Sequence, residues 1–173
     1  MPEPDSESTM DATAELIAEL TARRLTIGVA ESLTGGLLAA ELIRIPGASA
    51  VVNGAIVAYN TELKLSLLDV DGGILNVHGA VHPDVAKQMA VGARNRLAVG
   101  GVRAQVGVST TGVAGPGTQD GQLPGTVFIG LSLGSGSWAV PLHLTGDRSS
   151  IRVQTVQLAV EAVRELLARE DLE

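Results

Sequence analysis

The chain has 173 residues, of which 45% are hydrophobic, so it is long enough to form one domain with a full apolar core. Its net charge is −7, and the few large aromatic side chains (one Trp, one Tyr, one Phe) argue against a nucleic-acid-binding surface. The absence of cysteine excludes disulfides, thiol catalysis and thiolate metal sites. No apolar run reaches the roughly 18 residues of a membrane span. We therefore expect a cytoplasmic protein with neither nucleic acid nor membrane as a partner.

The first ten residues are acidic and polar and lack the basic and apolar regions of a signal peptide. We expect a flexible acidic tail over residues 1–10 and one domain over residues 11–173. Residues 11–23 have helical spacing, with Thr9 or Asp11 as the cap. An apolar run over 26–30 predicts the first strand, and residues 35–44 predict a helix that Pro46 and Gly47 end.

Residues 51–59 are rich in β-formers and apolar on both faces, which predicts a buried strand. A short helix is expected over 61–68, with Leu63, Leu67 and Leu68 facing inward and Lys64 on its first turns. The Asp-Gly-Gly sequence at 71–73 predicts a turn. Pro83 predicts the start of a helix that continues to about residue 97.

The second half of the chain predicts a strand over 102–111, a glycine-rich loop over 112–121 and a hairpin of two strands over 126–133 and 137–144. A last helix is expected after residue 148, with Asp147 or Ser149 as its cap and an apolar stripe that includes Val153, Val156 and Val160. This alternation predicts an α/β fold, a three-layer α/β/α sandwich on a mixed, mostly parallel sheet in a single domain.

Three of the predicted strand ends carry unusual residues: 32–36, 59–64 and 110–117. Because ligands bind beyond the carboxyl ends of strands in open α/β sheets, these segments could share one cleft. Ser32 lies on a turn between a strand and a helix, where it could be a nucleophile, a phosphate ligand or a helix cap. The residues alone leave these three roles open.

A serine nucleophile needs a base, and no histidine of this chain has a recognisable triad spacing. Lys64 could serve if burial lowers its pKa; the alternative is an ordinary solvated lysine. It is one of only two lysines, the other being Lys87. Tyr59 could relay protons beside Lys64 or could be a plain rim aromatic.

The glycine-rich loop matches neither a phosphate-binding Walker loop nor a dinucleotide fingerprint. Its backbone N–H groups could form an anion nest, or the loop could be a purely structural turn. His78 and His82 are four residues apart, but Pro83 removes His82 from helical geometry, so we expect no metal site.

Several short motifs occur in a fixed order along the chain: 30–36 (AESLTGG), Tyr59-Asn60 followed by Lys64, 78–81 (HGAV), 111–116 (TGVAGP), 125–127 (GTV) and 146–148 (GDR). From about residue 11 to the end, this set resembles the C-terminal domain of the competence/damage-inducible protein CinA, a family that includes stand-alone nicotinamide-nucleotide amidohydrolases. One departure is Gln122-Leu123-Pro124, where the family often has Lys-Pro before Gly-Thr-Val.

The resemblance implies an amidase that hydrolyses the carboxamide of nicotinamide mononucleotide to nicotinic acid mononucleotide and ammonia, without metal or cofactor. It also implies a homo-oligomer. Ser32 would be the nucleophile and Lys64 the base, with Tyr59 and Thr111 orienting them. The implied substrate-binding residues are Glu31, Thr34, Gly35, Gly36, Gly112, Gly115, Gly117 and Arg148, with backbone N–H groups of residues 34–36 holding the oxyanion. The alternative is a non-catalytic nucleotide-binding or regulatory domain of the same fold.

Overall fold

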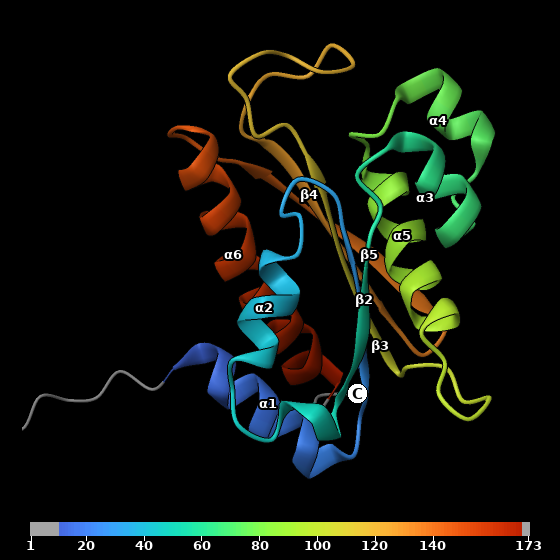
Figure 1. Cartoon of the computed structure of the whole chain (residues 1–173), viewed down its shortest axis with the longest axis vertical. Coiled ribbons are helices and arrows are strands. Elements are labelled where there is room, and N and C mark those ends of the chain that lie inside the picture. Colours follow the sequence, from blue (N-terminus) through green and yellow to red (C-terminus); the bar gives the residue numbers. More distant parts are fainter. Residues whose placement is uncertain (1–10, 171–173) are drawn as a thin grey trace, which may run out of the picture.

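A five-stranded mixed sheet forms the centre of this computed structural model, which describes residues 11–170 (Figure 1). In spatial order the strands are β2 (Val52–Val57), β1 (Ile27–Glu31), β3 (Val106–Gly112), β4 (Thr126–Leu133) and β5 (Gly136–His143). Strands β2, β1 and β3 are parallel, and β4 is antiparallel to both of its neighbours. The carboxyl ends of β1, β2 and β3 therefore lie along one edge of the sheet.

Helices cover both faces of the sheet and complete the predicted three-layer sandwich (Figure 1). One face carries α1 (Ala12–Arg23), α2 (Leu37–Ile43) and α6 (Arg148–Glu170), and the other carries α3 (Thr61–Leu68), α4 (Gly72–His78) and α5 (Pro83–Arg96). A short 3-10 turn, Ala48–Ala50, precedes β2. Each face has its own apolar core, the larger one beneath α1, α2 and α6.

Some elements differ from the sequence prediction. The strand expected over 102–111 begins at Val106, and Val102 instead pairs with Val99 in an isolated bridge. Strand β2 was expected to be buried on both faces, but it is an edge strand with half-buried side chains, because only β1 pairs with it. The expected turn at residues 71–73 is instead the start of α4, since the carboxylate of Asp71 caps that helix by accepting a hydrogen bond from the Ile74 N–H at 3.0 Å. Because glycine disfavours helices, the two glycines in the first turn of α4 hide the start of this helix from sequence-based prediction.

Helix α3 presents a different face to the core from the one predicted. Leu63 and Leu67 are exposed, whereas Lys64 and Leu68 are each only 1% exposed. Residues four apart share one side of a helix, so burial of Leu68 against α5 also turns Lys64 inward. On α6, Val153 is likewise exposed although the predicted stripe included it.

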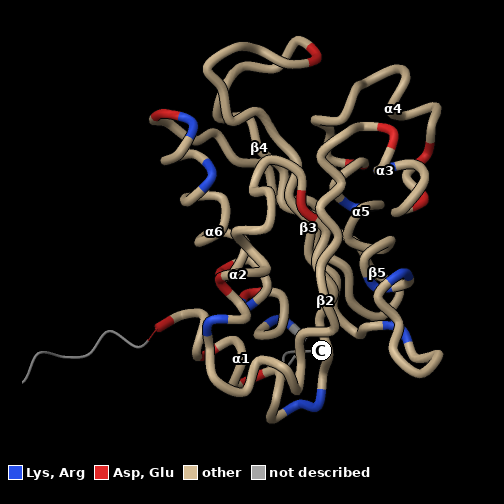
Figure 2. Tube along the Cα trace, in the orientation of Figure 1, with Lys and Arg blue, Asp and Glu red and all other residues tan. Residues whose placement is uncertain are grey.

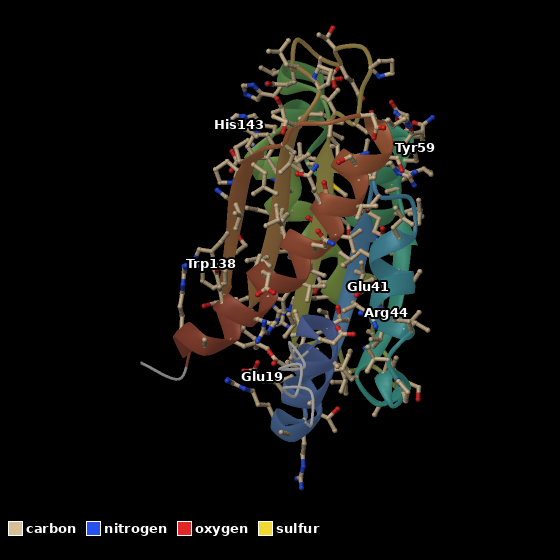
Figure 3. All side chains as sticks on the ribbon, turned by 90° about the vertical axis from the view of Figure 1, so that its left-hand side faces the viewer. Glu19, Glu41, Arg44, Tyr59, Trp138 and His143 are labelled. Atoms are coloured by element: carbon tan, nitrogen blue, oxygen red, sulfur yellow. The ribbon has the colours of Figure 1, made fainter. Side chains whose placement is uncertain are left out.

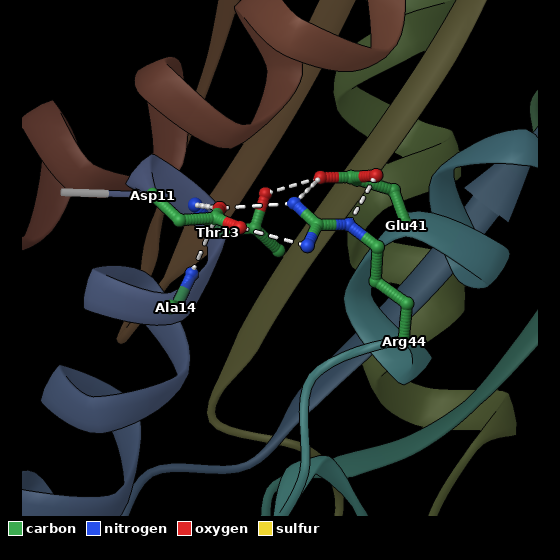
Figure 4. A network of polar contacts seen from close by, with 5 residues as sticks. All are labelled: Asp11, Thr13, Ala14, Glu41 and Arg44. Carbon is green, nitrogen blue, oxygen red and sulfur yellow. Dashed lines mark hydrogen bonds and ion pairs between the residues drawn. The ribbon is translucent and has the colours of Figure 1, made fainter. Parts of the chain in front are cut away.

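The first helix is tied to α2 by a network of polar contacts (Figure 4). Asp11 is the cap of α1 and accepts hydrogen bonds from the N–H groups of Thr13 and Ala14, as predicted; Thr9 lies outside the described residues. The Arg44 guanidinium binds both carboxylates of the network, at 2.7 Å to Asp11 and 2.7 Å to Glu41. These contacts lower the pKa of Asp11 and of Glu41 below their ordinary values, mainly through the hydrogen bonds from Arg44.

We expect this network to stabilise the fold only while its two carboxylates are ionised. A carboxyl group with a lowered folded-state pKa contributes stability above its ordinary pKa, here 3.8 and 4.5, and loses it as the pH falls through the lowered value. Arg44→Met should therefore lower the Tm slightly near neutral pH, with the difference from wild type shrinking below about pH 4. Thermal unfolding of both proteins at several pH values measures this difference in Tm. Arg96→Met, which removes the single ion pair with Asp69, is the matched control, and an Arg44→Met deficit that persists at low pH would assign Arg44 to packing alone.

Candidate active site

A pocket opens at the edge of the sheet where β1, β2 and β3 end. Its volume is about 330 Å³, within the range of small-ligand sites. The residues around it are Ser32, Leu33, Tyr59, Gly112, Val113, Ala114, Gly115, Gly117, Thr118, Gln119 and Arg148. Six of these were predicted as site residues: Ser32, Tyr59, Gly112, Gly115, Gly117 and Arg148. They come from segments far apart in the sequence, as the rule for open α/β sheets predicts.

Lys64 does not line the pocket itself but contacts Ser32, which does. Its Nζ is 3.0 Å from the Ser32 Oγ and donates a second hydrogen bond to the Ala58 carbonyl at 2.7 Å. Lys64 is 1% exposed and Ser32 is 8% exposed. The lysine is therefore not the solvated side chain of the alternative interpretation.

Burial lowers the pKa of Lys64 from an ordinary value of 10.5 to about 8, because desolvation disfavours the ammonium form. The carboxylate of Asp120 opposes this shift and raises the pKa. Neither hydrogen-bond partner of the Nζ carries a charge. A substantial fraction of Lys64 is thus neutral slightly above neutral pH, where its lone pair can accept a proton from Ser32.

Ser32 is not the cap of α2. The N-cap residue of that helix is Gly36, and no side chain caps it from that position. The carboxylate of Glu31 reaches the helix end instead and accepts hydrogen bonds from the N–H groups of Gly36, Leu38 and Ala39 at 2.8–3.1 Å. A carboxylate thus occupies the position where a helix N-terminus would otherwise attract an anion.

Glu31 has a structural role at this turn. Its side chain is fully buried and its two oxygens are bound to the start of α2, so it holds the backbone around Ser32; its contact with a substrate stays a prediction. The N–H of Gly36, expected to hold an oxyanion, is taken by Glu31, and the N–H of Gly35 donates to the Ser32 carbonyl at 3.1 Å. Gly35 and Gly36 therefore shape the turn, both with positive φ.

The turn after Ser32 is also held from the side of α6. The Arg152 guanidinium donates to the carbonyl of Leu33 at 2.8 Å and to that of Thr34 at 3.2 Å. Among residues 11–170, no acceptor binds the N–H groups of Leu33 or Thr34. Thr34 is fully buried, whereas Leu33, directly after Ser32, lines the pocket, so its N–H is the candidate donor to an oxyanion.

The threonine hydroxyls of the site have partners within the protein. The hydroxyl of Thr34 is bonded to that of Thr110 at 2.8 Å, and the hydroxyl of Thr111 donates to the Ala80 carbonyl at 2.7 Å. Alternate residues of a strand point to opposite faces, so Thr110 faces the Ser32 turn and Thr111 faces the segment before α5. Both hydroxyls are thus held by protein partners, and the catalytic role of Thr111 and the substrate contact of Thr34 stay predictions.

Tyr59 lies at the rim of the pocket and is 61% exposed (Figure 3). Its hydroxyl accepts a hydrogen bond from Arg148 at 3.1 Å, and Arg148 also donates to the Gly115 carbonyl at 2.8 Å. Within the described part of the chain, Tyr59 has no hydrogen bond to Ser32 or Lys64. Its position therefore fits contact with a substrate better than a proton relay.

Sequence reasoning gave Thr110, Arg152 and Asp120 no individual role, although Thr110 and Asp120 lie in segments that it singled out. Each acts through a partner distant in sequence, and no local spacing marks them. Among residues 11–170 there is no group of three or more His, Asp or Glu side chains that could hold a metal ion. In the same part of the chain, no helix combines the length and apolar character needed to cross a bilayer.

The fold and pocket define an α/β/α domain with a buried serine–lysine pair at the carboxyl edge of its sheet. The sequence profile of the CinA C-terminal domain matches residues 9–167. A CinA-like protein from Frankia casuarinae is 47% identical over 149 residues, which cover 86% of this chain but 33% of that relative. The chain belongs to the CinA C-terminal domain family.

Solved structures of the same superfamily have this fold. The competence/damage-inducible protein CihA from Agrobacterium tumefaciens has a TM-score of 0.81 and 35% identity, with 90% of this chain and 96% of that one covered. A competence-damaged protein (CinA) superfamily protein from Escherichia coli has a TM-score of 0.84 and 28% identity, with 96% and 94% covered. These descriptions refer to competence and damage and name no reaction.

Proposed function

We propose that this chain hydrolyses the carboxamide of nicotinamide mononucleotide to nicotinic acid mononucleotide and ammonia. The observation that carries the proposal is the 3.0 Å contact between the buried Lys64 Nζ and the Ser32 Oγ, together with the lowered pKa of Lys64. A nucleotide-binding domain without turnover, the alternative, has no need of a desolvated lysine on a serine hydroxyl. Family membership supports the same reaction through the resemblance described above.

In the proposed reaction, the Ser32 Oγ attacks the carboxamide carbon while neutral Lys64 takes the hydroxyl proton. The oxygen of the tetrahedral intermediate lies near the Leu33 N–H. Lys64 then gives its proton to the departing amine, which leaves as ammonia, and Ser32 remains acylated. Water, deprotonated by neutral Lys64, hydrolyses the ester and restores the serine.

The charge around the pocket supports a phosphorylated substrate. The chain has a net charge of −7, but Arg148 lines the pocket and Arg152 donates to the carbonyl of Leu33, another lining residue. Figure 2 shows basic positions at the start of α6, next to an acidic one. The hydrogen-bond partners of Arg148 are a carbonyl and a phenol, both neutral. An arginine with uncharged partners at a pocket rim remains available to pair with a phosphate.

The proposed reaction is tested by incubating the purified protein with nicotinamide mononucleotide and measuring both products, ammonia and the acid mononucleotide. Stoichiometric formation of the two products at a rate proportional to enzyme is expected. A protein that binds the mononucleotide, as measured by calorimetry, but releases no ammonia at any pH between about 6 and 9 would establish the non-catalytic alternative.

The glycine-rich segment of the pocket is expected to contact the 5′-phosphate or the ribose. Gly117 lines the pocket and has no atom within 4 Å of where a Cβ would lie, so Gly117→Val adds bulk without an internal clash. We expect the variant to raise the KM for the mononucleotide much more than the KM for nicotinamide riboside, which lacks the phosphate. Gly72→Val, at a glycine outside the pocket where a Cβ would meet only ordinary van der Waals contact with Leu65, controls for general effects, and equal losses on both substrates would assign the segment to structure alone.

A further inference from the structure

Arg152, on the second turn of α6, is a cation beside the site to which the proposed reaction gives no step. Its side chain is half-buried and, unlike that of Arg148, does not line the pocket. Within residues 11–170 its hydrogen bonds go to neutral oxygens: the Nε donates to the Leu33 carbonyl at 2.8 Å and the Nη2 to the Thr34 carbonyl at 3.2 Å. The charge of Arg152 is therefore applied to the backbone of the turn that follows the nucleophile.

The peptide groups of this turn connect Arg152 to the candidate oxyanion donor. They are trans, so the C=O and the N–H of each point in opposite directions. The peptide group with the Thr34 carbonyl also contains the Gly35 N–H, which donates to the Ser32 carbonyl at 3.1 Å. The peptide group with the Ser32 carbonyl in turn contains the Leu33 N–H. A series of hydrogen bonds thus runs from the guanidinium through two peptide groups to that N–H.

Such a series does two things to the Leu33 N–H at its end. It fixes the plane of the last peptide group, because the Ser32 carbonyl is held by the Gly35 N–H. It also polarises that group, since hydrogen bonds in series strengthen one another and a bond from a cation is stronger than one from a neutral donor. The free N–H is consequently a better donor to a negative oxygen than an isolated amide would be.

We propose that Arg152 is a positioning residue that orients and polarises the Leu33 N–H for the oxyanion. The inference rests on the proposed function. As the Ser32 Oγ bonds to the carboxamide carbon, its proton moves to Lys64 and the π pair of the C=O moves onto the oxygen. The donor is needed when this charge forms and not when the neutral carboxamide binds, so Arg152 should act on kcat and leave KM almost unchanged.

A contact with the substrate phosphate is the alternative role for a cation at this place. A phosphate ligand would lower the KM for nicotinamide mononucleotide and have no effect on nicotinamide riboside, which lacks the phosphate. An oxyanion role affects both substrates alike, because they contain the same carboxamide. Steady-state kinetics on the two substrates therefore separates the two roles of Arg152.

Arg152→Met removes the charge and both hydrogen bonds but keeps a long apolar stem. We expect its kcat to fall about 30-fold or more on both substrates, with KM within about threefold of wild type. Arg152→Lys keeps the charge and one donor, so it should recover part of the loss. Arg164→Met is the matched control, since it removes another half-buried arginine of α6, whose partners are Glu15 and Glu161, and should retain the wild-type kcat.

A second measurement needs no turnover and uses pyridine-3-boronic acid as the probe. Its trigonal boron accepts a lone pair from the Ser32 Oγ while the hydroxyl proton moves to Lys64, which gives a tetrahedral boronate with a negative charge. Boron-11 NMR detects this adduct, and a titration gives its Kd. We expect the wild type to form the adduct and Arg152→Met to bind the probe about tenfold more weakly or worse.

A wild-type kcat in Arg152→Met, or a rise in KM confined to the mononucleotide, would overturn the inference and leave the proposed function standing. If the wild type releases no ammonia, the proposed function fails and the boronate titration decides the inference. In that case, weaker binding by Arg152→Met supports the role of Arg152 at the Leu33 N–H. Equal affinity of the two proteins, or no tetrahedral adduct in the wild type, overturns it.

Discussion

Replacement of Ser32 by alanine is expected to lower ammonia release from nicotinamide mononucleotide by about four orders of magnitude or more. The substitution removes the oxygen that Lys64 contacts at 3.0 Å and leaves the turn around it intact. Glu31 still binds the end of α2, and Arg152 still binds the carbonyls of Leu33 and Thr34. The variant should therefore keep its fold and its affinity for the mononucleotide, and single-turnover kinetics with calorimetric binding measures both.

Ser109→Ala is the matched control for this variant. Ser109 is a fully buried serine on β3, and its hydroxyl donates to the Ala86 carbonyl at 2.7 Å, away from the pocket. Its loss should cost about 1 kcal/mol of stability and little activity. If Ser32→Ala retained activity comparable to that of Ser109→Ala, Ser32 would not be the nucleophile.

The sequence predicted the layers of the fold and the edge where the pocket lies, since both follow from general rules. Alternating strand and helix patterns require helices on both faces of a sheet, and strands that share a direction end at one edge. Ser32 and Lys64 were predicted as site residues because of their residue types and their positions just beyond the carboxyl ends of two predicted strands. The structure brings them into hydrogen-bond contact. Whether they react is what the activity measurements decide.

The contacts that each site residue makes inside the protein could not be predicted from the sequence, because they join segments that are distant along the chain. Helix α3 contains leucines on several sides, so periodicity alone did not reveal that Lys64 and Leu68 form its buried face. Glu31 resembles a substrate ligand in sequence, and only the position of α2 shows that three backbone N–H groups bind its carboxylate. Arg152 is 119 residues away from the carbonyl it binds.

The rate should depend on pH through Lys64. Since the neutral form is the base and burial lowers its pKa to about 8, kcat/KM is expected to rise as the pH increases through about 8. The same lowering of the Lys64 pKa makes the folded protein less stable at neutral pH. Between about pH 8 and 10.5 the unfolded chain holds a proton that the folded chain has lost, so wild-type stability rises with pH over this interval.

Lys64→Met should consequently be inactive yet more stable than the wild type at neutral pH. Methionine retains a long apolar stem and removes the buried charge, so its higher Tm should converge on that of the wild type as the pH rises from 8 to 10.5. This variant also verifies that loss of the amino group does not unfold the protein.

Lys64→Arg tests whether the residue acts as a base or only as a positive charge. Arginine keeps the charge but cannot become neutral in a protein, so it cannot take the Ser32 proton. We expect kcat/KM to fall as far as in Ser32→Ala, with the circular dichroism spectrum unchanged. The double variant Ser32→Ala, Lys64→Arg should be no less active than either single variant, because two groups that act as one unit lose their function at the first substitution. A Lys64→Arg protein with more than about a tenth of wild-type activity would reassign the base, and Tyr59, at the rim of the same pocket, would be the next residue to test.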